Sequence, residues 1–202
     1  MALEWGLCDN HPIKHNVSKF SIKPRDRYLE DWELEEALTV APILMKAYIP
    51  IKQLTGLRKG DMLSIKHSDL KDDGIYVVQN KTGKRIIIEW TPELEDAVEY
   101  AKSIRKKIGS IWLFSTNRGQ PYIKEDKTTS GFNSIWKRWQ DKAVKATDLE
   151  QKFVESDLRA KTASDTTEQH ATDLLDHSTT AVTQRHYRRK PKVVKPHSLH
   201  KK

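Results

Sequence analysis

The sequence has very little cysteine: Cys8 is the only one among 202 residues. A single thiol cannot form an internal disulfide and cannot build a cysteine-based zinc site, which fits a reducing cytosol. No apolar run approaches the length needed to cross a bilayer. The first twelve residues also lack the basic start and apolar stretch of a secretory signal. These absences predict a soluble cytoplasmic protein with no membrane partner.

Several motifs of enzyme chemistry are missing as well. The chain has no Gly-x-Ser-x-Gly segment of a serine hydrolase and no glycine-rich phosphate loop of the Walker type. The histidines at positions 170, 177 and 186 do not have a convincing metal-ligand spacing. We therefore expect no cofactor, no bound metal and no use of ATP.

Positive charge, by contrast, is in excess. The chain carries 36 Lys and Arg against 28 Asp and Glu, a formal net charge of +8. Such an excess favours a polyanionic partner, because cations that contact phosphates release condensed counterions. Nucleic acid is the polyanion that we expect, but charge alone does not say what the protein does to it.

The pattern of apolar residues predicts a mainly helical domain with one small antiparallel sheet. Residues 28–38 begin a helix whose first turns are acidic, as the helix dipole favours. A more apolar segment, residues 41–56, should end as a helix at Gly56. Pro42 and Pro50 should break it into shorter helical pieces, because proline cannot donate the helical hydrogen bond.

The clearest strand signal is a hairpin over residues 74–90, where two runs rich in Ile and Val flank Lys-Thr-Gly-Lys. Gly83 supplies the positive φ that the turn needs. Thr91 and Pro92 then suit an N-cap and a first helical residue, and apolar residues follow at helical spacing. The run IWLFS, residues 111–115, predicts a third short strand.

A last long amphipathic helix is expected over residues 130–147. Its large apolar side chains lie at helical spacing, which favours the core and leaves stacking on nucleic-acid bases as the alternative: Phe132, Ile135, Trp136 and Trp139. We expect an extended arm over 1–27, one domain over 28–190 and a basic tail over 191–202 that lies along the partner.

Two Leu-Arg pairs and a C-terminal cluster remain to be explained. They stand in TGLRKGDMLSIKHSDL, in SDLRAKTASD and in LLDHSTTAVTQRHYRR, and a lysine lies in the hairpin QNKTGKRIIIEW. Any one of these arginine, lysine, histidine or tyrosine residues, taken alone, is more often part of a surface salt bridge or a packed side chain. In this order, however, they resemble the catalytic domain of tyrosine recombinases, the phage-integrase family of DNA strand-exchange enzymes. The resemblance runs from about residue 4 to the end of the chain.

The resemblance implies five catalytic residues: Arg58, Lys81, Arg159, His177 and Tyr187. Tyr187 would attack a phosphodiester and form a covalent 3′-phosphotyrosyl link. The two arginines would bracket one phosphate, because a guanidinium keeps its charge and donates two parallel hydrogen bonds. Lys81 would protonate the leaving 5′ oxygen, and His177 would hydrogen-bond the phosphate.

The chain departs from the family pattern at two positions. Ser156 stands where the family has the histidine of His-x-x-Arg, and serine cannot act as a base near neutral pH. Asp176 replaces the glycine before His177, and its charge should favour the protonated imidazole. Asp61 of the first box and His186 beside the nucleophile are further, secondary candidates.

Double-stranded DNA with attachment sites is the implied partner. Basic residues near the boxes should contact it: Lys59, Lys84, Lys161, Arg185, Arg188 and Arg189. The family implies a homotetramer on DNA, with a monomer possible for the free chain, and the family's N-terminal core-binding domain has no counterpart here. The implied function is prophage integration or excision in a bacterial cytoplasm. A degraded DNA-binding remnant and a type IB topoisomerase are the alternatives.

Overall fold

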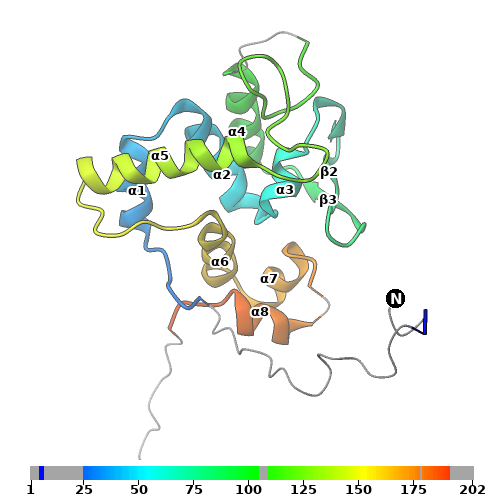
Figure 1. Cartoon of the computed structure of the whole chain (residues 1–202). Coiled ribbons are helices and arrows are strands. Elements are labelled where there is room, and N and C mark those ends of the chain that lie inside the picture. The colour runs from blue at the N-terminus through cyan, green and yellow to red at the C-terminus, as the bar shows by residue number, and fades with distance from the viewer. Residues whose placement is uncertain (1–4, 7–24, 105–108, 178, 192–202) are drawn as a thin grey trace, which may run out of the picture.

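The computed structural model describes residues 5–6, 25–104, 109–177 and 179–191. Figure 1 shows a mainly helical body with one small sheet at its right-hand side. The elements are α1 (Asp31–Thr39), α2 (Ile43–Thr55), α3 (Lys59–Leu63), the 3₁₀ helix η1 (His67–Asp69), β1 (Leu70–Lys71), β2 (Gly74–Val78), β3 (Arg85–Glu89), α4 (Pro92–Ser103), α5 (Ser130–Ala146), α6 (Glu155–Asp165), α7 (Glu168–Leu174) and α8 (Thr180–His186). The predicted fold class is confirmed. Most of the predicted arm and tail lies outside the described residues.

The sheet is antiparallel, with strand order β1-β2-β3. β2 and β3 form the predicted hairpin, with Ile75 opposite Ile88, and Gly83 in its loop has a φ of 71°. The prediction of a strand at 111–115 is wrong, since β1 is the third strand and Trp112 makes only an isolated bridge with Lys66. Within this apolar run only Leu113 and Phe114 are buried in the core, whereas Ile111 is exposed, and such a short apolar run resembles a strand in sequence.

Helix α2 lies at the centre of the larger body. It packs against α4 on one side and α6 on another, while α1 packs against α5. Pro42 is its N-cap, but Pro50 lies inside the helix, so the predicted break there is wrong. The buried neighbours Tyr48, Ile49 and Ile51 hold the segment in one helix despite the missing donor.

The aromatic residues of α5 complete this core. Phe132, Trp136 and Trp139 are buried, and the Trp139 indole donates a 2.8 Å hydrogen bond to the Ala37 carbonyl on α1. Their burial removes them from base stacking. The basic residues of the helix are exposed: Lys137, Arg138, Lys142 and Lys145.

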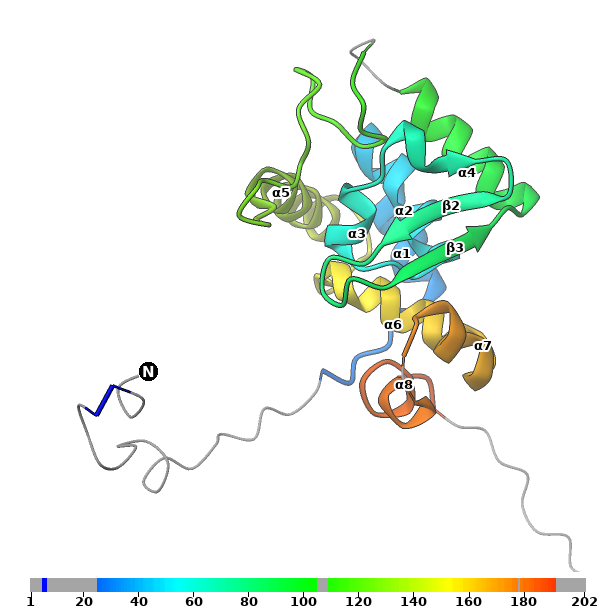
Figure 2. The same cartoon turned by 90° about the vertical axis from the view of Figure 1, so that its right-hand side faces the viewer.

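A second, smaller cluster forms at the C-terminal end. Figure 2 shows α6 between the body that carries the sheet and the pair α7 and α8. Ala163, Ala171 and Leu175 are buried together there, and Tyr187 packs against them. Helix α6 therefore touches both clusters, which places residues of the distant Leu-Arg boxes near the C-terminal tyrosine. Among the described helices, none has the length and apolarity to span a membrane.

Candidate active site

Arg58 lies where α2 gives way to α3. Gly56 ends α2 with a φ of 58°, and Arg58 is the extended N-cap residue of α3. Its Nη1 donates a 2.9 Å hydrogen bond to Oε1 of Gln79, the buried residue at the base of the hairpin loop. Asp61, on α3, accepts a 2.8 Å hydrogen bond from the Asn80 backbone. Helix α3 thus holds the start of the loop that carries Lys81.

Arg159 projects from α6 and is only 4% exposed. It donates to the Gly56 carbonyl and, at 2.9 Å, to the Leu175 carbonyl, so it joins the turn before Arg58 to the end of α7. Its Nε–H is buried and has no hydrogen-bond partner among the described residues. A buried donor without an acceptor is costly, and such a group indicates a place for a ligand.

The two arginines act on one another electrostatically. Burial lowers the pKa of Arg159, the Tyr187 phenol acts to raise it, and repulsion from the Arg58 guanidinium lowers it again. Two guanidiniums this close are unfavourable unless an anion lies between them. The structure therefore brings together the arginines of the two boxes, which are about a hundred residues apart in the sequence.

His177 and Tyr187 adjoin Arg159. The rings of His177 and Tyr187 have centroids 4.8 Å apart at an angle of 34°, and the Arg159 Cζ lies 5.2 Å from the centre of the Tyr187 ring. Arg159 Nη2 lies 3.3 Å from His177 Nε2. The Tyr187 backbone is fixed as well, since its carbonyl accepts a 3.1 Å hydrogen bond from Ser164 of α6. The tyrosine therefore lies beside the arginine of its own chain.

Asp176 acts on His177 in the expected direction, but it does not decide the charge of the ring. Burial lowers the pKa of His177 to about 4, and repulsion from Arg159 and Arg58 acts in the same direction. Asp176 acts to raise this pKa but is outweighed. Its carboxylate instead pairs with Lys84 of the hairpin at 3.0 Å. His177 is therefore neutral near pH 7.

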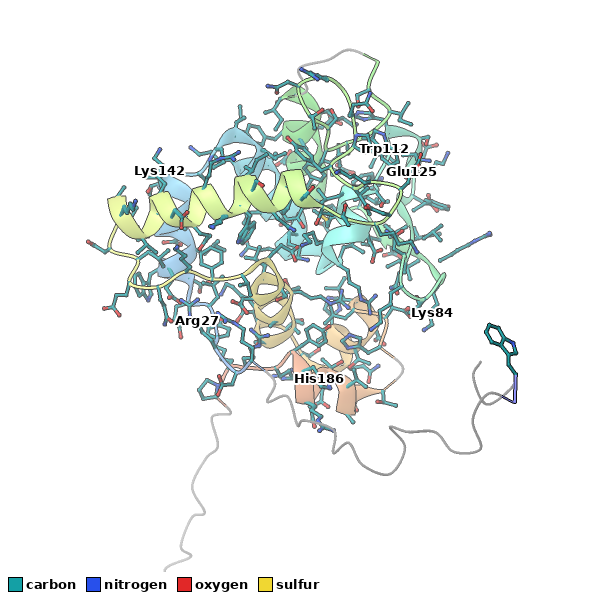
Figure 3. The ribbon with its side chains drawn as sticks, viewed as in Figure 1. Arg27, Lys84, Trp112, Glu125, Lys142 and His186 are labelled. Carbon is teal, nitrogen blue, oxygen red and sulfur yellow. The ribbon has the colours of Figure 1, made fainter. Side chains whose placement is uncertain are left out.

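The remaining candidates lie in less enclosed positions. Lys81 is exposed on the loop between β2 and β3, and the Lys84–Asp176 pair ties that loop to the segment before His177. Figure 3 shows Lys84 on the side of the molecule that holds α7, with His186 on α8. Ser156 and His186 are both exposed. Asp61 is buried and holds the hairpin loop rather than lining the space beside Arg159.

Two of the expected DNA contacts have structural roles instead. Lys161 is 3% exposed and pairs with Asp31 and with Asp165 at 2.9 Å. The Arg189 side chain is buried against the Asp157 carboxylate. We therefore do not propose Lys161 or Arg189 as DNA contacts.

The other expected DNA contacts keep access to solvent. Lys84, Arg185 and Arg188 are exposed, while Lys59 is half-buried and donates to Asn133 at 2.9 Å.

Sequence reasoning missed three residues that support the site. Gln79 joins Arg58 to the hairpin, Thr183 contacts His177 at 2.8 Å, and Asp157 holds Arg189. A signal was present for Thr183, because a residue four positions before Tyr187 on a helix lies on the same face. Gln79 and Asp157 depend on contacts between distant segments and carry no comparable local signal.

Comparisons with known proteins agree with the geometry of this site. A family model described as the phage integrase family matches residues 29–192. The integrase of Escherichia phage lambda is 24% identical over 126 residues, which is 58% of this chain and 35% of that protein. The integrase of Enterobacteria phage 434 is 27% identical over 100 residues, or 48% and 27% of the two chains. The matches thus span about a third or less of these relatives.

Solved structures show the same fold. A lambda integrase tetramer bound to a Holliday junction matches with a TM-score of 0.71 and 23% identity, over 97% of this chain and 58% of that one. The XerA recombinase matches with a TM-score of 0.65 and 22% identity, over 88% and 62%. Because the family model covers most of its length and the residues of the family's boxes converge in space, the chain belongs to the phage integrase family.

Proposed function

We propose that this chain is the catalytic domain of a site-specific tyrosine recombinase that cleaves and rejoins DNA through a phosphotyrosyl intermediate. The observation that carries the proposal is Arg159, whose buried Nε–H lacks a partner among the described residues while Arg58, His177 and Tyr187 surround it. A phosphate would supply the missing acceptor and relieve the repulsion between the guanidiniums.

The chemistry follows from these positions. The Tyr187 phenol loses its proton to solvent, a loss that the neighbouring guanidiniums favour. Its oxygen attacks the phosphorus, a bond to the 3′ phosphate forms, and the bond from phosphorus to the 5′ oxygen breaks. Arg58 and Arg159 neutralise the non-bridging oxygens in the pentacoordinate state. Lys81, from the hairpin loop, donates its proton to the leaving 5′ oxygen. Religation runs these steps in reverse.

This scheme needs no external source of energy. The phosphotyrosyl bond keeps the energy of the broken phosphodiester, so ATP is not required. The two guanidiniums supply the positive charge that the transition state demands, so we propose a reaction that is independent of metal ions as well.

We further propose double-stranded DNA as the substrate and a tetramer as the assembly that exchanges strands. A similar integrase has been solved as a tetramer on a Holliday junction, and other similar integrases as DNA complexes. The excess of positive charge favours this partner. Integration or excision of a prophage, in the bacterial cytoplasm, is the corresponding biological role.

A trapping experiment tests the activity without a known target site. The full chain is incubated with a pool of duplexes of random sequence, each carrying a nick, so that cleavage near the nick releases a short strand and traps the adduct. We expect a covalent protein–DNA species that resists denaturation. Tyr187→Phe should abolish it, and Arg159→Ala should reduce it by at least a hundredfold.

The alternatives give different results in the same system. A degraded remnant binds the pool and forms no adduct, which would contradict the proposal. A topoisomerase relaxes supercoiled plasmid that contains no selected site, whereas a recombinase enriches particular sequences from the pool.

A further inference from the structure

The side-chain oxygen of Gln79 joins two parts of the site. Gln79 is buried and directly follows β2. Its Oε1 accepts a 2.9 Å hydrogen bond from Nη1 of Arg58 and a 2.8 Å hydrogen bond from the Thr82 hydroxyl. Thr82 is the next residue after Lys81. One oxygen atom therefore connects the arginine of the first box to the loop that carries the lysine.

The backbone of Gln79 closes the same loop. Its amide donates to the Lys84 carbonyl at 2.8 Å, and its carbonyl accepts from the Gly83 amide at 2.8 Å. The next residue is held as well, because the Asn80 amide donates to Asp61 of α3 at 2.8 Å. The loop between β2 and β3 therefore has a fixed base, and the side chain of Gln79 starts from that base.

The amide group suits this position because it is neutral. Arg58 can only donate, so the oxygen of the amide and not its nitrogen must face the guanidinium. A carboxylate would also accept this hydrogen bond, but it would cancel the charge that a phosphate needs. Gln79 orients the guanidinium and leaves its charge intact.

Arg58 keeps donors for a substrate. In the described structure its side chain makes no hydrogen bond other than the one from Nη1 to Gln79. The Nε and Nη2 groups form the edge of the guanidinium that can donate two parallel hydrogen bonds to phosphate oxygens. The contact with Gln79 therefore fixes the direction of this edge without using it.

We propose that Gln79 is a positioning residue that couples the orientation of Arg58 to the placement of Lys81, through the hydroxyl of Thr82. The inference rests on the proposed function. In the cleavage step, the bond from phosphorus to the 5′ oxygen breaks and that oxygen takes its proton from Lys81, while Arg58 balances the charge of the non-bridging oxygens. Because one oxygen holds both groups, charge neutralisation and proton donation are available at the same linkage.

Substitutions on both sides of this junction separate coupling from packing. Gln79→Leu keeps the approximate volume and removes the shared oxygen, while Gln79→Glu keeps the shape and places a carboxylate against Arg58. Thr82→Val removes only the connection to the loop, and it should fold because Thr82 is exposed. Gln140→Leu is the matched control, since Gln140 on α5 is also buried and accepts from the Phe153 amide at 3.0 Å.

Altered scissile linkages show which group a variant has misplaced. A duplex selected from the nicked pool is made with sulfur in place of the 5′ oxygen, so that the leaving group departs as a thiolate and needs no proton from Lys81. A second duplex carries a methylphosphonate, which has no negative charge and depends less on Arg58. Adduct formation on both is compared with the ordinary phosphodiester, at a temperature where every variant is folded.

We expect Gln79→Leu to form the adduct about tenfold to a hundredfold more slowly than the parent chain on the phosphodiester. This deficit should shrink by about threefold or more on either altered linkage. Gln79→Glu should be slower still on the phosphodiester and should recover on the methylphosphonate. The deficit of Thr82→Val should shrink with the sulfur linkage alone. Gln140→Leu should stay within about threefold of the parent chain on all linkages.

Two results would overturn the proposal outright: a Gln79→Leu variant that cleaves at the parental rate, or a deficit of the same size on every linkage. The second pattern would indicate a general loss of structure and not the misplacement of particular groups. If the methylphosphonate alone relieves the deficit, Gln79 holds only Arg58, and the coupling to Lys81 is wrong.

NMR of the Arg58 guanidinium tests the contact without catalysis. The hydrogen bond to Gln79 should slow rotation about the Cζ–Nη1 bond, so the parent chain and Gln140→Leu should show separate Nη1 proton signals that Gln79→Leu lacks. If the parent chain traps no DNA while these signals are present, the proposed function and the coupling fail together. If it traps DNA and the guanidinium rotates freely, only this inference fails.

Discussion

Gly56 and Asp176 both have left-handed backbone, with φ values of 58° and 49°. They lie on the two sides of Arg159, which binds the carbonyl of Gly56 and that of Leu175. A Cβ on Gly56 would also lie 2.6 Å from Leu175 Cδ2. The turn before Arg58 therefore needs glycine for two separate reasons, whereas an aspartate can adopt the left-handed conformation at position 176 at modest cost.

The two reasons can be measured separately by comparing two glycines. Gly83 has a φ of 71° and nothing within 4 Å of its built Cβ, so Gly83→Ala should cost only the backbone term, about 1 kcal/mol. Gly56→Ala adds the collision with Leu175 and should cost roughly 2–3 kcal/mol in all. Urea unfolding of both variants gives the difference. Equal losses would mean that Leu175 moves aside freely.

The neutral state of His177 has a consequence for stability. Its folded pKa of about 4 lies below the ordinary value of 6.5, so the unfolded chain binds more protons between these pH values. The free energy of unfolding should therefore fall as the pH drops from about 6.5 to 4. The loss should be about 1 kcal/mol once solvent screening of this half-buried ring is allowed for.

The variant His177→Gln isolates the contribution of His177 to the pH dependence of stability. The variant has no titrating ring, so its stability should lack the His177 part of the slope while the acidic residues still contribute theirs. Unfolding curves across this pH range for the two chains give the comparison. Identical slopes would show that His177 is protonated in the folded state as readily as in the unfolded one.

At the scale of elements, the end of α8 is held to α6 by a buried ion pair. The Asp157 carboxylate accepts from Arg189 and, at 2.9 Å, from Arg25, and it also accepts from the Val154 amide at 3.0 Å. Ser164 bonds the Tyr187 carbonyl and the Arg189 amide. The backbone from Tyr187 to Arg189 is therefore attached to α6 on both sides of Arg188.

Arg189→Ala should release this attachment. Breaking a buried pair leaves Asp157 with less compensation and costs about 3–5 kcal/mol, but the segment can detach without unfolding the domain. We expect hydrogen exchange of the Tyr187 amide to rise by at least tenfold. Arg188→Ala is the control, because the Arg188 side chain is exposed and donates to the Thr166 carbonyl at 3.1 Å, not to a buried carboxylate. Equal exchange in the two variants would contradict the role of the ion pair.

Elements with local signals were predictable from the sequence. The hairpin with Gly83, the N-cap Thr91 and the helix end at Gly56 all follow from turn and cap chemistry, and the structure contains each of them. The predictions fail where contacts between residues distant in the sequence determine the local structure. Pro50 stays inside a helix because its neighbours are buried. In residues 111–115, Leu113 and Phe114 are buried in the core without forming a strand.

The site shows the same division. The family's boxes placed Arg58, Arg159, His177 and Tyr187, which the structure brings together. The protonation state of His177 was not predictable, since it depends on burial and on two arginines from other segments. Positive charge alone was also a poor guide to DNA contacts. A lysine looks the same in the sequence whether it is exposed or, like Lys161, paired with an aspartate inside the fold.

At the scale of the whole molecule, exposed cations lie on different helices, among them Lys142 on α5 and Arg185 on α8. In Figure 3, Lys142 on α5 lies at the upper left and His186 on α8 near the bottom. If DNA lies over the site formed by Arg58, Arg159 and Tyr187, the exposed cations of α8 should contact its phosphates and those of α5 should not. The dependence of binding on salt reports how many phosphates are contacted.

Single substitutions can therefore map the face that binds DNA. Each phosphate contact contributes about 0.9 to the slope of the logarithm of affinity against the logarithm of salt concentration. Arg185→Ala removes an exposed cation of α8 and should lower the slope by about that amount on a short duplex of arbitrary sequence. Lys142→Ala should leave the slope unchanged. Lys161→Met should do so too, because Asp31 and Asp165 already neutralise that lysine. If Lys142→Ala lowered the slope as much as Arg185→Ala, binding would follow the total charge of the molecule and not the face that contains the arginine pair.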